Sequence, residues 1–157
     1  YAISTMFAID RYSSFKKVWE EFYNNGGIVI ADRYTMSNMI HQGSKIKDKD
    51  DKSKYINWLK DLEFDKMRLP KPDKVIFLDM PFEMSQILIK NRKNKITGED
   101  KKDIHENDDD HLKLAYRNAC MIAKEQKWSS ILCVKNGEIK TIEDINDDIY
   151  KIVKEMV

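Results

Sequence analysis

Apolar residues recur at helical spacing through the first 24 positions of the chain. The stripe comprises Ile3, Met6, Phe7, Phe15, Val18, Trp19 and Phe22. Apolar positions three and four residues apart predict an amphipathic helix. The run Asn24-Asn25-Gly26-Gly27 supplies the residues that end a helix. The pattern therefore predicts one long helix over residues 1–24, followed by a break.

Three short apolar segments predict strands, and helical patterns separate them. The predicted strands are 28–31 (IVIA), 75–79 (VIFLD) and 129–135 (SSILCVK). Helical spacing is found over 35–42, 55–67, 82–93, 111–127 and 141–156, with Thr141 and Asp144 resembling a helix cap. Segment 28–31 is entirely apolar, so we expect it to be buried on both faces. Alternating strands and helices predict an α/β fold, a parallel sheet with helices on both faces.

Composition narrows the class of protein. The 157 residues suit a single domain, with a polar, lid-like segment at about 91–110. Lys plus Arg number 28 and Asp plus Glu number 27, so no basic excess exists to hold nucleic acid. Apolar runs of about four residues are too short to span a membrane. Cys120 and Cys133 form no CxxC pair, which favours reduced, buried thiols and a cytoplasmic setting.

A polar cluster follows the predicted strand 28–31. Asp32, Arg33 and Tyr34 come first, and hydroxyl, amide and imidazole groups follow at Thr35, Ser37, Asn38, His41 and Gln42. Ligands of parallel α/β sheets bind beyond the carboxyl ends of the strands, so a site is expected here. Arg33 can grip phosphate oxygens in two places. Asp32 would then orient Arg33 or contact a magnesium-bound water. The alternative is that Asp32 and Arg33 form a purely structural ion pair.

A second candidate feature lies on the first helix. Phe7 and Arg11 are four residues apart and share a helix face. An aromatic face suits a flat base, and a guanidinium suits a carbonyl on that base. The alternative is that Phe7 is a core residue of the apolar stripe.

Three segments in order resemble the thymidylate kinase family. They are TMFAIDR (5–11), DRYTMSNMIHQG (32–43) and LPKPDKVIFLDMP (69–81), and the resemblance extends over almost the whole chain. It implies a P-loop nucleotide kinase fold. It also implies an enzyme that transfers the γ-phosphate of ATP to dTMP with Mg²⁺. It also implies nucleotides as partners and a homodimer formed through long helices.

The resemblance assigns roles to individual residues. Phe7 would stack on thymine, Arg11 would bind its O4 edge and Arg33 would hold the 5′-phosphate. Asp32 would support Arg33 and the metal. Near the base edge would lie Ser37, Asn38 and Gln42, and beside the deoxyribose would lie His41, where the family usually has an aromatic residue.

The resemblance also assigns residues to phosphoryl transfer and to the binding of ATP. Arg92, and second Lys95, would stabilise the charge on the moving phosphoryl group. Asn136 and Gly137 would border the adenine of ATP; the alternative is an ordinary turn after a strand.

No G-x-x-x-x-G-K-[ST] motif is found, because glycine occurs only at 26, 27, 43, 98 and 137. The family carries its P-loop on the first strand–helix unit, which is expected to be missing here. Strands 28–31 and 75–79 would then lack a shared neighbour, and we expect the isolated chain to be inactive. Two alternatives stay open: a non-catalytic nucleotide-binding homologue, and a kinase of another nucleoside monophosphate or deoxynucleoside.

Overall fold

The computed structural model describes residues 1–90 and 109–156. They form two compact units, Tyr1–Pro72 and Asp73–Val157. The single-domain organisation stays a prediction. Of the predicted lid at 91–110, only Asp109 and Asp110 belong to the described residues, where they begin a helix.

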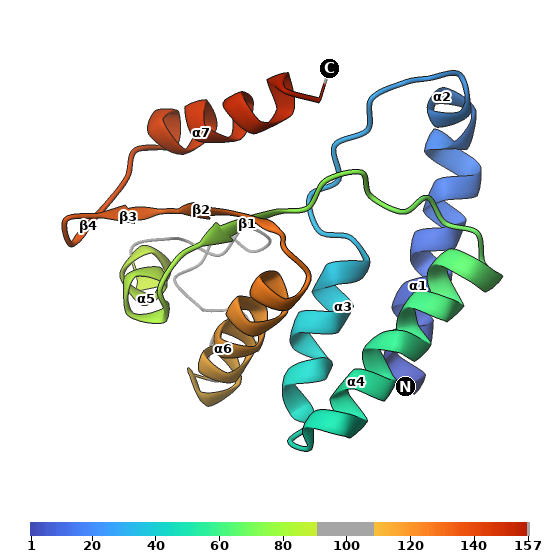
Figure 1. Ribbon diagram of the computed structural model, residues 1–157, viewed down its shortest axis with the longest axis horizontal. Coiled ribbons are helices and arrows are strands. Elements are labelled where there is room, and N and C mark those ends of the chain that lie inside the picture. The colour runs from blue at the N-terminus through green and yellow to red at the C-terminus, as the bar shows by residue number, and fades with distance from the viewer. Residues whose placement is uncertain (91–108, 157) are drawn as a thin grey trace. The chain divides into compact units, whose positions relative to one another are not determined.

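The regular elements of the first unit are all helices. Its elements are α1 (Ala2–Ser14), η1 (Phe15–Trp19), α2 (Glu20–Asn24), α3 (Thr35–His41), η2 (Gly43–Lys45), α4 (Lys49–Lys60) and η3 (Asp61–Lys66) (Figure 1). The predicted helices over 1–24, 35–42 and 55–67 are confirmed. Both η1 and η3 are π-helical, and Met67 N donates to Leu62 O at 2.9 Å across five residues. The elements follow one another directly, so 2–24 and 49–66 are continuous helical stretches with locally wide turns.

The core of this unit uses a different face of α1 from the apolar stripe. Ser4, Ala8 and Phe15 are buried, whereas most of the stripe is exposed: Ile3, Met6, Phe7, Val18 and Phe22. Helix α1 contacts α3 and η3, and α3 also contacts α4. Small side chains at Ser4 and Ala8 let these helices approach α1 closely, and Met39 and Leu59 fill the space at zero exposure.

The predicted strand 28–31 is wrong. Residues 1–72, all of which are described, contain no strand. Ile28, Val29 and Ile30 are 59%, 37% and 84% exposed. A strand buried on both faces needs hydrogen-bonded neighbours on either side and helices above and below, and this unit has no sheet to provide them. Local apolar composition alone therefore does not make this segment a strand.

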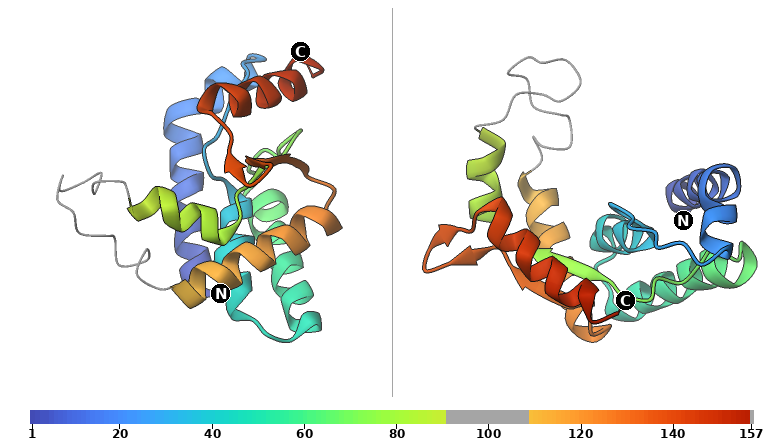
Figure 2. Two further views of the ribbon diagram at one scale, coloured as in Figure 1. Left: turned by 90° about the vertical axis from the view of Figure 1, so that its left-hand side faces the viewer. Right: turned by 90° about the horizontal axis from the view of Figure 1, so that it is seen from above.

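The second unit contains the parallel sheet. Strands β1 (Ile76–Asp79) and β2 (Ser129–Leu132) pair in parallel, with Ile76 opposite Ser129. Helices α5 (Phe82–Lys90) and α6 (Asp109–Glu125) lie on one side of these strands, and α7 (Ile142–Lys154) lies on the other (Figures 1 and 2). This arrangement confirms the α/β class and the parallel connection.

The segment predicted as one strand over 129–135 is two strands. After Cys133 the chain continues as β3 (Val134–Lys135), which pairs with β4 (Glu138–Ile139) in an antiparallel hairpin. Asn136 and Gly137 form its two-residue turn with φ of 53° and 84°. Positive φ at both positions defines a type I′ turn, for which Asn-Gly is the preferred pair. The turn prediction at this dipeptide is confirmed.

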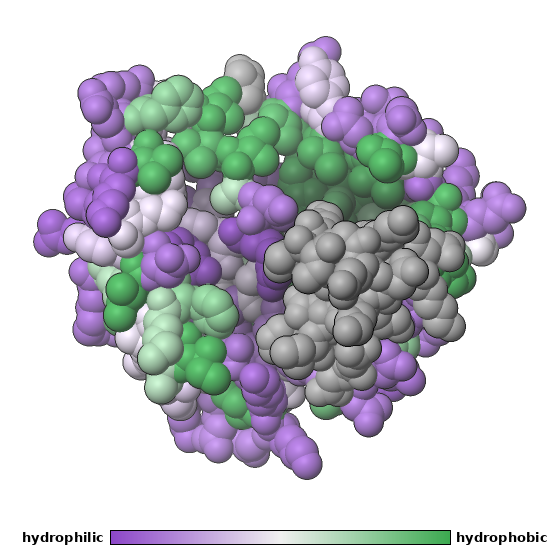
Figure 3. Space-filling model, turned by 180° about the vertical axis from the view of Figure 1, so that it is seen from behind, coloured by the Kyte–Doolittle hydropathy of each residue, from purple (hydrophilic) through white to green (hydrophobic). Residues whose placement is uncertain are grey.

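The second unit contains a capped helix and two free cysteines. Thr141 Oγ1 accepts from the Asp144 amide at 3.1 Å, which confirms the predicted cap of α7. Cys120 and Cys133 are free thiols, and burial raises the pKa of both. Apolar side chains also reach the surface of the chain in several groups (Figure 3).

No helix among the described residues combines the length and the apolar character needed to cross a bilayer.

Candidate functional site

A buried carboxylate is the centre of the polar network in the first unit. Glu63, on η3, is 0% exposed. Arg11 Nη1 donates to both of its oxygens, at 2.9 Å and 3.1 Å, and forms an ion pair with it. Thr35 Oγ1 donates to Oε2 at 2.6 Å, and Asn38 Nδ2 lies 3.5 Å from Oε1. One carboxylate thus joins side chains from α1 and α3.

A second layer of hydrogen bonds fixes the same helices. Asn38 Nδ2 donates to the Ser4 carbonyl at 3.1 Å. The Tyr55 hydroxyl donates to the Asn38 carbonyl at 3.2 Å and lies 2.9 Å from Ser4 Oγ. Because the single Tyr55 proton goes to Asn38, the Ser4 hydroxyl is the donor to Tyr55. The network therefore links α1, α3 and α4, and the donor and the acceptor of each of these three hydrogen bonds are defined.

Arg11 has further neighbours that hold its guanidinium in place. Nη1 also donates to the Phe7 carbonyl at 3.3 Å, and the guanidinium lies over the Tyr34 ring, 5.3 Å from its centroid. Tyr34 donates its hydroxyl proton to Pro70 O at 3.1 Å. Burial raises the pKa of Tyr34 to about 12, so the ring remains a neutral donor at physiological pH. The hydrogen bond from Arg11 to the Phe7 carbonyl shows that these two predicted residues share a face of α1. The Phe7 side chain is 51% exposed.

Arg33 lies at the exposed start of α3. Its φ of 68° is in the left-handed region, which is uncommon for a residue other than glycine. Arg33 Nε donates to Ser37 Oγ at 3.2 Å, which brings two of the predicted site residues together. The side chain does not enter the core. Strained backbone of this kind is concentrated at functional sites, where surrounding structure maintains it.

Asp32 is exposed and forms no ion pair with Arg33 within the part of the chain that the structure describes. The structural Asp32–Arg33 ion pair considered from the sequence is therefore not what positions Arg33.

The remaining predicted residues fall into three groups. His41 and Gln42 lie at the C-terminal end of α3 and are half-buried, and Gln42 Oε1 accepts from Lys45 Nζ at 3.1 Å. Asn136 and Gly137 form the hairpin turn of the second unit. Arg92 and Lys95 lie outside the described residues.

Sequence reasoning missed Glu63, although a signal for it exists. Tyr55, Leu59 and Glu63 are spaced by four residues on one predicted helix, and the first two are core residues. A carboxylate on the apolar face of a helix is almost never fully buried unless it is paired. An acidic residue in this stripe, with an arginine on another amphipathic helix, therefore indicates a buried ion pair.

In the second unit, Asp79 is the last residue of β1, at the carboxyl end where ligands of such sheets bind. Tyr116, on α6, donates its hydroxyl proton to Asp79 Oδ1 at 2.8 Å. Burial, and then this hydrogen bond, raise the pKa of the Tyr116 hydroxyl well above its usual range. No pattern in the sequence marks either residue as part of a site.

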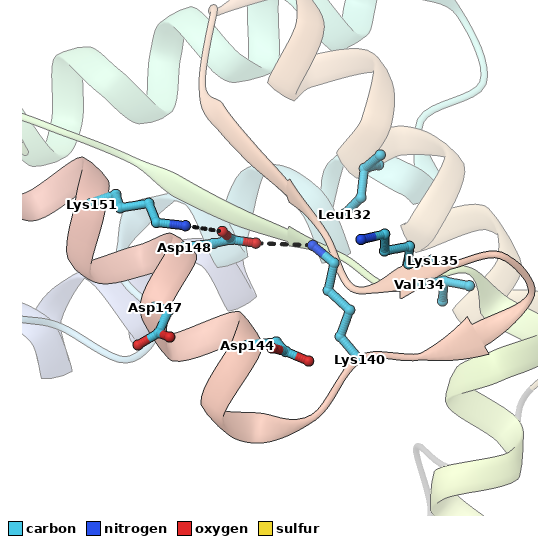
Figure 4. A pocket seen from close by; sticks show the side chains of 8 residues that line it. All are labelled: Leu132, Val134, Lys135, Lys140, Asp144, Asp147, Asp148 and Lys151. Carbon is cyan, nitrogen blue, oxygen red and sulfur yellow. Dashed lines mark hydrogen bonds and ion pairs between the residues drawn. The ribbon is translucent and has the colours of Figure 1, made fainter.

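The second unit also has a cavity of about 500 Å³ beside α7 (Figure 4). It is lined by Leu132, Val134, Lys135, Lys140, Asp144, Asp147, Asp148 and Lys151. Lys140 and Lys151 both pair with Asp148, at 2.9 Å and 3.2 Å, and their hydrogen bonds lower the pKa of that carboxyl. The three lysines of the lining are balanced by three aspartates, so the cavity has no positive excess and is poorly suited to a nucleotide phosphate. The Asn136-Gly137 turn does not line it.

The described residues contain no cluster of three or more His, Cys, Asp or Glu side chains that could hold a metal ion. Mg²⁺ in phosphoryl-transfer sites is held by one or two carboxylates together with waters and substrate phosphates. Exposed Asp32 fits the role of such a single carboxylate. The triphosphate of ATP has no glycine-rich cradle in these 157 residues.

Comparisons with known proteins agree on one family. The family model for thymidylate kinase matches residues 1–145. The chain is 31% identical over 157 residues to a probable thymidylate kinase of Thermococcus onnurineus, covering 98% of this chain and 64% of that protein. It is 30% identical to a probable thymidylate kinase of Pyrococcus horikoshii, over 98% of this chain and 64% of that protein. A thymidylate kinase of Prochlorococcus marinus is 26% identical over 95% of this chain and 64% of its own length. The chain thus spans less than two thirds of these relatives.

Proposed function

Because the chain belongs to the thymidylate kinase family, we propose that residues 1–72 bind dTMP and that the protein serves the transfer of the ATP γ-phosphate to it. The observation that carries the proposal is the buried Glu63 carboxylate, which binds both Arg11 and Asn38. These two residues come from different helices and are the ones expected to read the base. Their convergence on a single fixed group supports a preorganised recognition site.

The base would be bound by α1 and α3. Phe7 is exposed and free to stack on a pyrimidine, as an aromatic ring does at low cost in conformational entropy. Arg11 would donate to O4, and Asn38 would accept from N3–H. Ser37 and His41 lie on the same helix, α3, and Gln42 caps its C-terminal end; all three would border the base and the sugar.

The 5′-phosphate would be bound by Arg33. Its Nε is used by Ser37, and its two terminal nitrogens make no hydrogen bond to any described residue. A guanidinium with both terminal nitrogens available can bind two phosphate oxygens at once. Asp32, next in the chain and exposed, would bear on Mg²⁺ or its waters.

The transfer step is proposed for Arg92 and Lys95, with ATP and Mg²⁺ as co-substrate and metal. When bound, Mg²⁺ neutralises charge on the transferring phosphates. Cationic side chains on the lid would stabilise the same charge and exclude water. Asn136 and Gly137 are proposed to border the adenine. The free thiols Cys120 and Cys133 fit a reducing, cytoplasmic compartment.

Calorimetric titration of the chain with nucleoside monophosphates tests the proposal. We expect dTMP to bind most tightly, dUMP several-fold more weakly because it lacks the 5-methyl group, and dCMP at least about 100-fold more weakly. UMP reports how well His41 rejects a 2′-hydroxyl. Equal affinity for dTMP and dCMP would contradict the proposed reading of the base.

A second arm measures transfer from ATP with Mg²⁺. We expect no dTDP from the chain alone, and dTDP once a P-loop strand and helix from a thymidylate kinase precede Tyr1. Selective dTMP binding without transfer in that chimaera would favour the second candidate, a non-catalytic nucleotide-binding homologue.

We also propose a homodimer formed through the first helical stretch. Ile3, Met6, Val18 and Phe22 are 53% to 77% exposed there, and the other elements of the first unit leave this apolar face uncovered. Analytical ultracentrifugation should give a dimer for the chain and a shift toward monomer for Met6→Lys combined with Val18→Lys. A monomeric chain at micromolar concentration would contradict the proposed dimer but not the proposed nucleotide site.

A further inference from the structure

We propose that Glu63 is a positioning residue that sets the base selectivity of the site. By accepting hydrogen bonds from Arg11 and Asn38, it fixes which atoms of these side chains remain for the ligand. The site then suits a pyrimidine with an N3–H donor and a 4-oxo acceptor, as in thymine and uracil. It rejects cytosine, whose N3 accepts and whose 4-amino group donates. This inference rests on the proposed function of residues 1–72.

The neighbours of the Asn38 side chain fix the orientation of its amide. Its two near neighbours are the Ser4 carbonyl oxygen at 3.1 Å and Glu63 Oε1 at 3.5 Å. Both are acceptors, so the amide nitrogen, and not the amide oxygen, must face them. Asn38 Oδ1 makes no hydrogen bond to any described residue. The atom left for a ligand is therefore an acceptor, as N3–H requires.

Arg11 can offer a ligand only donors. A guanidinium has five donors and no acceptor. Nη1 is used by both Glu63 oxygens and by the Phe7 carbonyl, at 2.9 Å to 3.3 Å. Within the described residues, Nη2 and Nε have no such partner. The group that remains for a ligand is thus a donor, which suits a 4-oxo group and repels a 4-amino group.

A carboxylate at position 63 can accept from all three of its side-chain partners. Glu63 is fully buried and accepts from three side chains, including Thr35 at 2.6 Å. An ionised carboxylate has only acceptors. A glutamine at this position would instead place an NH₂ group against at least one of these donors. Asn38 could then accept from that NH₂ group by turning its oxygen inward and giving up its 3.1 Å hydrogen bond to the Ser4 carbonyl, which would present its NH₂ group to the ligand.

Glu63→Gln tests this inference. We measure the affinities for dTMP and dCMP by calorimetry and compare their ratio. The unsubstituted chain should prefer dTMP by at least about 100-fold. We expect the ratio to fall to within about tenfold in Glu63→Gln, with weaker dTMP binding and unchanged or stronger dCMP binding. Glu63→Asp keeps the acceptor chemistry and should retain most of the selectivity while lowering both affinities.

Tyr55→Phe is the matched control. It removes a hydroxyl from the same buried network without touching Glu63, so it should lower thermal stability and leave the selectivity ratio unchanged. A ratio that is unchanged in Glu63→Gln, or that falls equally in Tyr55→Phe, would show that Glu63 is merely structural. If the unsubstituted chain has no preference for dTMP, the proposed function fails and the inference fails with it.

A measurement on the unsubstituted chain covers the case in which Glu63→Gln does not fold. The Asn38 side-chain NH₂ protons should exchange slowly with solvent in nuclear magnetic resonance spectra, with and without dTMP, because they face Ser4 and Glu63. Rapid exchange typical of a solvent-exposed amide would overturn the proposed orientation.

Discussion

Replacing Arg33 by alanine is expected to weaken dTMP binding by about 100-fold. The guanidinium is the charged group at the exposed start of α3 whose terminal nitrogens are free to bind the 5′-phosphate. Its removal deletes a charge-assisted, two-pronged contact. Thymidine has no 5′-phosphate, so its affinity should be the same for both proteins. Calorimetric titration with the nucleotide and the nucleoside measures the two effects separately.

Two further variants sharpen this test. Arg33→Lys keeps the positive charge but loses the two-pronged guanidinium contact. Its affinity for dTMP should lie between those of the unsubstituted chain and Arg33→Ala. Lys17→Ala removes an exposed cation from η1 and should change neither affinity. An equal loss of thymidine and dTMP binding in Arg33→Ala would contradict a phosphate contact and would indicate a change in the fold of the site.

Replacing Glu63 by alanine is expected to lower the free energy of unfolding by about 3–5 kcal/mol, as when one partner of a buried ion pair is removed. The side chain of Arg11 is 15% exposed, and it would lose its counter-charge in that environment. Thr35, 0% exposed, would lose its acceptor as well. Urea unfolding followed by circular dichroism measures the change. Glu21→Ala, at an exposed position on α2, should change stability by less than about 0.5 kcal/mol.

The double variant Arg11→Met with Glu63→Met separates stability from recognition. Buried ion pairs replaced by apolar residues of similar volume often lose no stability. The double variant should therefore be considerably more stable than Glu63→Ala, yet it should not discriminate between dTMP and dCMP. If it binds dTMP with the selectivity of the unsubstituted chain, the ion pair has no part in reading the base.

Periodicity was sufficient to predict most elements of this chain. The helices over 1–24, 35–42 and 55–67, the parallel pair β1 and β2, and the cap at Thr141 all depend on local chemistry that the residues themselves specify. Asn136-Gly137 is a similar case, because a type I′ turn needs positive φ at two successive positions and few other pairs accept it.

The failures have a common physical cause, since they concern properties that depend on neighbours distant in sequence. Segment 28–31 has strand composition, but a strand also needs a sheet, which its unit lacks. The apolar stripe of α1 indicated a buried face, but α1 packs through Ser4 and Ala8 instead. For the candidate site, the spacing of Phe7 and Arg11 was readable, whereas their fixation by Glu63 required knowing that α1 and η3 touch.

The wide turns of η3 have a consequence for the length of this part of the chain. Residues 61–66 take more positions to complete a turn than the ordinary 3.6, and Glu63 lies among them. Each residue of an α-helix advances by about 100° around the axis. The wide turns already absorb the rotation of one residue, so loss of a single residue here would let the backbone relax to a regular α-helix and leave the later residues on their present faces. Homologues with a one-residue gap in this segment should therefore keep the apolar face of the helix unshifted on either side of the gap.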